Sequence, residues 1–379
     1  MTLPQAPVFL AQHTAKGRGH DLLAAVGTAR DKDSKTPPGL LLDFGAVHLR
    51  GVEQDAQSAG KLTPVVASGS AYETASKWKV PMAPWVQRAA PKNRAEWDAT
   101  VGESLAKQRA LGLDALVVPG VELESADYPK GLESQVDAVR RAWASRSDDD
   151  PPWLVEVCVH DDWINNENAC RHVLNLLTDL SDPIGIALRV RFKRREAASN
   201  ADSLKRLKLV VEALADDGRR VLVVQSGVIG WLSIAWGAWG FTAGTSQASW
   251  LYNRTVFGRR SDQPAPPRVE RYFERQLLHP VLASDHARLS GGAGYTQCKC
   301  TFCETLEGGA WNHNVAAQHA LYALASLTKA VARADRAARR DAVRSTIEAA
   351  QNHWAQWKDI SGLSNRAQPA GLLVWRSLV

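Results

Sequence analysis

The sequence predicts an α/β fold: a (βα)8 barrel of the TIM type, followed by a small metal-binding subdomain and extra C-terminal helices. Two observations predict the barrel. Eight continuous apolar runs alternate with helical runs, and they span about 250 residues, which is typical of such barrels. No G-x-G-x-x-G motif follows the first strand, which argues against an open doubly wound sheet. A third observation, a group of cysteines after the last strand, predicts the subdomain.

Each expected strand is an unbroken apolar run, which is typical of strands buried on both faces. The expected strands cover residues 8–11, 39–44, 63–70, 113–120, 153–162, 184–191, 220–227 and 240–246. Amphipathic helical runs lie between them, at about residues 19–26, 94–111, 131–145, 168–180, 203–215 and 229–236. This alternation of strand and helix is what predicts repeated βα units.

The segment after the last strand changes character. Residues 251–290 are polar and predicted to be irregular. A helix is expected to end near residue 333, and a charged, alanine-rich and solvated helix is expected over 333–344, with a further helix to about 357. We therefore expect a barrel over 1–290, a metal subdomain with its following helix over 291–334, and a helical extension over 335–379.

The three cysteines of that subdomain, Cys298, Cys300 and Cys303, form a C-x-C-x2-C pattern. Three thiolates and one imidazole complete a closed tetrahedral zinc site, which is structural rather than catalytic. The histidine is either His313 or His319, and His319 suits because it opens an apolar helical run. Zinc is favoured over an iron–sulfur cluster because one ligand is a histidine and no further cysteine lies nearby.

Composition narrows the class of protein further. The chain has 379 residues, 45% of them hydrophobic, and a formal charge of +6, which is compatible with a phosphate-bearing partner. Cys158 and Cys170 are isolated, so no disulfide framework is expected and a reducing cytoplasm is predicted. A secretory signal pattern and a bilayer-length apolar run are both lacking, so we expect no membrane segment.

In such barrels the functional groups lie at the carboxyl ends of the strands. Polar residues at these ends are Asp43, Ser68, Gly69, Ser70, Glu122, His160, Asp161, Asp162, Arg189, Arg191, Gln225, Ser226, Thr242, Gly244, Thr245 and Ser246. They are the candidates for catalysis and ligand binding.

Among them, His160, Asp161 and Asp162 are the densest group. An acid beside a histidine could orient it or raise its pKa for general acid/base chemistry. The alternative is that the two aspartates cap the helix that follows. Residues 244–246 are expected to bind phosphate through backbone N–H groups, or to form a plain turn. Arg189 and Arg191 share one face of their strand, and facing inward they would need an anion.

The cysteine pattern followed by His319-Ala-Leu-Tyr-Ala-Leu-Ala-Ser-Leu resembles the tRNA-guanine transglycosylase superfamily. The resemblance implies a (βα)8 barrel with a zinc subdomain near its C-terminal end. It also implies that His319 is the fourth ligand, with His313 as the alternative because the spacing from Cys303 is shorter than usual for the family.

The family's catalytic motifs are altered here. Family enzymes use one aspartate as nucleophile on the sugar C1′ and another as general acid/base. Ala67 precedes Ser68, Gly69 and Ser70 at the place of the second aspartate, and Thr242 follows Phe241 at the place of the nucleophile. A carboxylate is needed to stabilise an oxocarbenium-like centre, so ordinary base exchange is not expected.

The resemblance therefore implies a divergent protein that binds a nucleic acid or a 7-deazapurine or nucleotide ligand. If active, it would be a transglycosylase-like pentosyltransferase, with Thr242 as a candidate catalytic residue. Family relatives act on tRNA or DNA, some support a catalytic partner, and some belong to antiphage defence systems, so a protein partner or homodimer is expected. Two alternatives remain: a purely structural partner subunit, or a barrel hydrolase that uses His160 with Asp161 or Asp162.

Overall fold

The structure of the chain is a computed structural model. The described residues are 3–12, 39–43, 65–68, 91–120, 130–180, 184–192, 200–244, 269, 271–307, 312–332 and 335–379.

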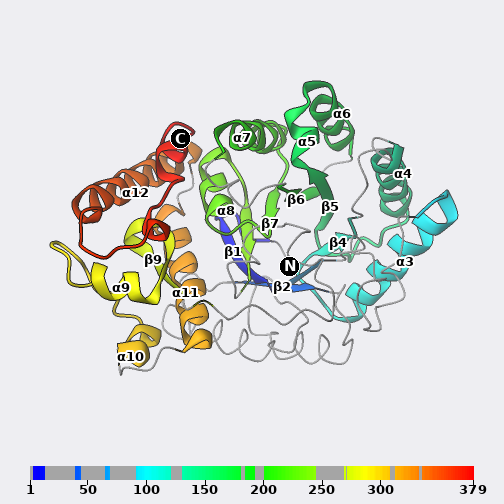
Figure 1. Cartoon of the computed structure of the whole chain (residues 1–379). Helices are drawn as coiled ribbons and strands as arrows, with labels where there is room; N and C mark the ends of the chain where they lie inside the picture. Colours follow the sequence, from blue (N-terminus) through cyan, green and yellow to red (C-terminus); the bar gives the residue numbers. More distant parts are fainter. Residues whose placement is uncertain are drawn as a thin grey trace, which may run out of the picture.

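Eight parallel strands form the central sheet, and each overlaps one of the apolar runs that predicted it (Figure 1). The strands are β1 Val8–Gln12, β2 Gly39–Asp43, β3 Val65–Ser68, β4 Leu116–Val118, β5 Trp153–His160, β6 Gly185–Arg191, β7 Val221–Val224 and β8 Gly240–Ala243. Their hydrogen-bonded order is β3-β2-β1-β8-β7-β6-β5-β4, so the first strand pairs with the last.

The prediction of a closed (βα)8 barrel is wrong, because the sheet is open and curled, with β3 and β4 as its outer strands. Between these two strands the described residues place one isolated parallel bridge, from Val66 to Ala115. β4 has only three residues, the fewest of the eight strands, so it offers few backbone groups for a second ladder on the side away from β5. Apolar runs indicate burial on both faces, and they do so equally for an open and a closed sheet.

Helices cover the outer side of the curled sheet (Figure 1). They are α3 Arg94–Ala110, α4 Lys130–Ala144, α5 Asp161–Asn165, α6 Glu167–Thr178, α7 Ala201–Asp216 and α8 Gly227–Ser233, which continues into the short η4 Ile234–Trp236. Asn93, Asn166 and Asn200 begin α3, α6 and α7, and each side chain accepts a hydrogen bond from a backbone N–H of the first turn. These caps satisfy donors that a helix otherwise leaves unpaired.

The two faces of the sheet belong to different hydrophobic clusters. One face packs against the helices, through residues such as Leu40, Val155 and Ile186. The other face carries a smaller cluster drawn almost wholly from strands, including Leu10 and Leu154. Because side chains alternate along a strand, this smaller cluster marks the inner face of the curl.

The chain after the sheet forms a second group of elements, which lies beside α8 and β1 (Figure 1). They are β9 Arg271–Glu274, η7 Arg275–Leu277, β10 His279–Leu282, α9 Ala283–Leu289, α10 Thr301–Glu307, α11 His313–Val331, α12 Arg336–Trp357, η8 Asn365–Ala367 and α13 Leu372–Arg376. Helix α11 packs against β9, α10, β1 and α8, so it connects this group to the sheet.

Two predictions for this region need correction. Residues 271–282, predicted to be irregular, form the antiparallel hairpin β9–β10. Buried Tyr272, Phe273 and Val281 hold it against the protein, although polar residues dominate the local sequence. The two helices expected between 333 and 357 are one helix, α12, whose buried side chains recur at helical spacing on one face.

None of the helices in the described segments is long and apolar enough to span a bilayer.

Candidate metal centre and strand-end residues

Cys298, Cys300, Cys303 and His319 converge on one point, and their ligand atoms all lie within 4.8 Å of one another. Cys300 Sγ and Cys303 Sγ are each 3.3 Å from His319 Nδ1, and Cys298 Sγ is 3.9 Å from it. The two sulfurs of Cys300 and Cys303 are 3.5 Å apart. The structure thus brings His319 to the cysteines and leaves His313 out of the cluster.

These spacings suit one tetrahedral ion. With Zn–S bonds of about 2.3 Å and Zn–N bonds of about 2.0 Å, a tetrahedron separates its sulfurs by about 3.8 Å and sulfur from nitrogen by about 3.5 Å. The three sulfur–nitrogen distances, 3.3, 3.3 and 3.9 Å, lie on either side of the ideal value, and the Cys300–Cys303 sulfur separation of 3.5 Å is slightly below its ideal. Three of the four residues are buried, and four protein ligands leave a tetrahedral ion no open position.

The local sequence explains how the ligands meet. Cys298 and Cys300 lie in the loop before α10, and the Cys300 carbonyl accepts hydrogen bonds from the N–H groups of Cys303 and Glu304. That turn brings Cys303, on the first turn of α10, back beside Cys300. His319 lies inside α11 and is fully buried, so the fourth ligand comes from a separate rigid element.

The hairpin β9–β10 fixes the orientation of His319. Its Nε2 lies 2.9 Å from the Phe273 carbonyl, which selects the tautomer with a proton on Nε2 and leaves Nδ1 free to bind a metal. Tyr272 stacks on the His319 ring at 4.3 Å, and its hydroxyl lies 3.1 Å from Cys303 Sγ. A hydroxyl at this place can donate to a metal-bound thiolate.

A further layer of polar contacts surrounds Tyr272. The ring of His286 stacks on its other face at 3.7 Å, and His286 Nδ1 lies 3.2 Å from Glu274 Oε2. Tyr295 donates its hydroxyl proton to the same carboxylate oxygen at 3.1 Å. Burial, followed by the neighbouring thiol or carboxylate charge, raises the pKa of Tyr272 and Tyr295 well above the usual range, so both remain protonated donors.

Without a metal, the cluster would share protons unevenly. Hydrogen bonds from Cys300 and Cys303 lower the pKa of the Cys298 thiol, whereas the bond with Cys298 raises that of Cys303. Burial lowers the pKa of His319, but hydrogen bonds with Cys298 and Cys300 outweigh it and raise the value to about 9. A divalent cation would replace these protons, so metal binding would release protons.

A second polar cluster, the strand-end network, lies on the inner face of the sheet. It consists of Gln12, Glu156, Arg189, Gln225 and Thr242. Arg189 donates to Glu156 Oε1 from Nε at 2.9 Å and from Nη2 at 2.7 Å, and its Nη1 donates to Gln225 Oε1. The arginine and the glutamate are both about 1% exposed, so the inward-facing cation has its anion within the protein.

Thr242 is bound within this network. Its hydroxyl oxygen accepts from the Gln225 N–H at 2.7 Å and donates to Gln12 Oε1 at 3.1 Å. Both hydrogen-bonding roles of the hydroxyl are filled, and the residue is fully buried. In this arrangement the hydroxyl stabilises the network instead of presenting a nucleophile.

Gln225 adopts a left-handed backbone conformation, with φ of 53°. Residues other than glycine adopt it at a cost, and such strain tends to gather at functional sites. Here the conformation turns the Gln225 N–H toward Thr242 while its side chain reaches Arg189.

His160, Asp161 and Asp162 lie at the junction of β5 and α5. His160 is the N-cap residue of α5 and makes no side-chain cap bond, and the aspartates begin the helix instead of capping it. His160 Nε2 lies 2.9 Å from Arg191 Nη1, so this nitrogen accepts from a cation. Asp162 is exposed.

Several predicted residues lie outside what the structure describes. Gly69, Ser70, Glu122, Thr245 and Ser246 are outside the described residues, and so are the side chains of Asp43, Ser68 and Asp161. The backbones of Asp43 and Ser68 pair at the ends of β2 and β3. Gly244 is buried directly after β8, and Ser226 is buried after β7, where its hydroxyl donates to the Val223 carbonyl.

Sequence reasoning missed the partners of the candidate residues. Glu156 stands inside an apolar strand, and a charge in such a run signals a buried ion pair, so it could have been found. Tyr272, Phe273 and Glu274 carried no comparable signal, because their role depends on how the hairpin folds back on α11.

No family model, no curated protein and no solved structure matches the chain. The resemblance to the tRNA-guanine transglycosylases therefore has no support from these comparisons.

Proposed function

We propose that the Cys298, Cys300, Cys303 and His319 cluster binds one structural zinc ion that fastens the loop before α10, and α10 itself, to helix α11, which packs against the sheet. Four protein ligands in tetrahedral spacing, three of them thiolates, suit zinc and leave no position for a substrate. The His319 contact with Phe273 also joins the ligand helix to the hairpin.

We propose further that the protein is a divergent relative of the tRNA-guanine transglycosylases which binds a purine-type base, either free or within a nucleic acid. The observation that carries this proposal is the Cys3His cluster placed after an eight-stranded parallel sheet, in the order along the chain that the family uses. The open sheet is a departure from the family's barrel.

The altered chemistry follows from the strand-end network. Thr242 replaces the expected nucleophile, and its hydroxyl is committed to Gln225 and Gln12. A threonine without a neighbouring base does not attack an anomeric carbon at a useful rate. We therefore propose binding without the family's base exchange, as in an accessory subunit of a modification or defence system.

A purely structural partner subunit is the second candidate. The observation that favours it is that Arg189, Glu156 and Gln225 satisfy one another and so need no ligand. The hydrolase alternative has less support, because His160 Nε2 already accepts from Arg191.

One purification tests these proposals together. The chain is isolated without chelators, its metal is measured by mass spectrometry, and the protein is extracted for bound bases and nucleic acid. We expect about one zinc per chain, and calorimetry with guanine and 7-deazaguanine should give saturable binding. Zinc without any base or nucleic acid would favour the structural subunit, and a chain without metal would remove the main support for the family proposal.

A further inference from the structure

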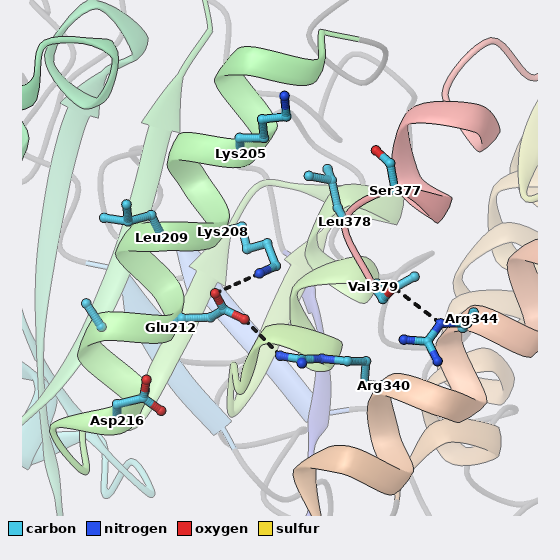
Figure 2. A pocket seen from close by; sticks show the side chains of 11 residues that line it. Lys205, Lys208, Leu209, Glu212, Asp216, Arg340, Arg344, Ser377, Leu378 and Val379 are labelled. Carbon is cyan, nitrogen blue, oxygen red and sulfur yellow. Dashed lines mark hydrogen bonds and ion pairs between the residues drawn. The ribbon is translucent and has the colours of Figure 1, made fainter.

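An open cavity of about 670 Å³ lies between α7, α12 and the segment after α13 (Figure 2). None of its lining residues belongs to the metal centre. From α7 it is lined by Lys205, Lys208 and Glu212, among others, and from α12 by Arg340 and Arg344. The α7 residues recur at three- and four-residue intervals, as do the two arginines of α12, so each helix turns one charged face toward the cavity.

The two carboxylate side chains that line this cavity, Glu212 and Asp216, both come from α7. Lys208 and Arg340 pair with Glu212 at 2.8 and 2.9 Å (Figure 2). Arg336, just beyond the lining, bonds to both Glu212 and Asp216. These carboxylates are therefore occupied by cations of the protein.

Beyond Glu212 and Asp216 the lining has no other carboxylate side chain, and it includes Lys205, Ser377 and Arg344, which lies beside Val379 (Figure 2). Lys205 is exposed and has no ion-pair partner in the described part of the chain. Arg344 pairs with Asp341 at 3.0 Å, but that carboxylate is 72% exposed, so the pair is weak. Its Nε donates to the Val379 carbonyl at 3.2 Å, which orients the guanidinium at the cavity.

The geometry points to this cavity as a binding site for the phosphodiester backbone of a nucleic acid. Two of the four lining cations, Lys208 and Arg340, are paired with Glu212, so the positive charge left for a ligand is that of Lys205 and Arg344, which come from two different helices. The two α12 arginines that line the cavity, Arg340 and Arg344, lie about 6 Å apart along the helix axis. This spacing suits a polyanion better than a single small anion. The inference rests on the proposed nucleic-acid function and places the contact on the outer side of the sheet.

Fluorescence anisotropy with a labelled short RNA and its DNA counterpart, at several salt concentrations, tests the inference. The variants are Lys205→Ala and the double variant with Arg344→Ala, and Lys130→Ala is the matched control. Lys130 is an exposed lysine at the start of α4, across the molecule from α12 (Figure 1). Lys205→Arg keeps the charge and should bind as the wild type does.

We expect the slope of log affinity against log salt to fall by about one for each cavity cation removed, with Lys130→Ala unchanged. RNA and DNA should weaken equally, because backbone contacts carry no base information. If the wild type binds and the cavity variants show the same salt slope as Lys130→Ala, the inference is overturned. The proposed function is left intact by that result. Tighter binding of a poly-glutamate peptide, lost in Lys205→Ala, would overturn it in favour of an acidic protein partner. A wild-type chain that binds neither oligonucleotide would overturn the inference, and one that also binds no purine would overturn the proposed function as well.

Discussion

The metal centre and the strand-end network are both buried polar clusters, and they differ in whether their groups satisfy one another. In the network, an arginine donates to a glutamate and to an amide oxygen, so the buried cation has its acceptors within the protein. In the metal centre, three thiols and an imidazole, all of them metal-ligating groups, face one another. Buried metal-ligating groups that converge on one point indicate an external ligand, whereas a closed set of donors and acceptors indicates a self-sufficient core.

The largest expected effect is at the metal centre. Cys300→Ser should abolish zinc binding and lower the free energy of unfolding by about 5 kcal/mol or more. Structural zinc sites bind their metal with about 10–16 kcal/mol, and much of this binding energy stabilises the fold. Zinc content and urea unfolding measure it. Cys158→Ala is the matched control, because Cys158 is also a buried cysteine but lies on β5, outside the cluster. Equal zinc content in the two variants would show that the cluster is not a metal site.

The strand-end network should behave differently when both members of its ion pair are replaced. Arg189→Met alone leaves the Glu156 carboxylate buried without its cation and should lower the free energy of unfolding by about 3–5 kcal/mol. Adding Glu156→Leu should restore at least half of that loss, because two apolar side chains can replace a buried ion pair. Urea unfolding of the single and double variants measures the coupling. Strictly additive losses would contradict the picture of a self-sufficient pair.

A smaller effect is expected at the contact between the hairpin and the metal ligands. Tyr272→Phe removes the hydroxyl that lies 3.1 Å from Cys303 Sγ and should weaken zinc binding about tenfold or more. Tyr295→Phe removes a hydroxyl that bonds to Glu274 instead, and it should leave zinc affinity nearly unchanged. Competition with a chelator of known affinity compares the two. Equal losses would mean that the whole aromatic layer, not the bond to Cys303, sets the affinity.

The same contrast explains what the sequence could predict. The metal ligands were predictable because chelating residue types at short spacing carry a chemical signal, and α11 carried the fourth ligand at its buried position. The positions of the strands were predictable from apolar runs. Closure of the sheet was not predictable. It depends on how many residues of β3 and β4 pair, and the apolar pattern does not determine that number. The partners of Arg189 and Cys303 were missed because they lie on strands 33 and 31 residues away in the sequence.

The smallest effect is expected at an ion pair near the surface, which gives a reference for both buried clusters. Arg109 donates from Nε and Nη2 to the two carboxylate oxygens of Asp150, each at 2.7 Å, and this hydrogen bonding lowers the pKa of Asp150. A lowered pKa in the folded state means that the contribution is present above the unfolded pKa of about 3.9 and is lost as pH falls through the folded value. Asp150→Asn should therefore lower the free energy of unfolding by about 1 kcal/mol at neutral pH, because Arg109 is 39% exposed and solvent partly screens the pair. This loss should shrink as pH falls below about 4. Urea unfolding at neutral and acidic pH, with the exposed neighbour Asp149→Asn as control, measures it. A loss of stability that stays constant with pH would show that packing, not charge, holds Asp150. A loss as large as that of Arg189→Met would remove the distinction between the buried pair and this more exposed one.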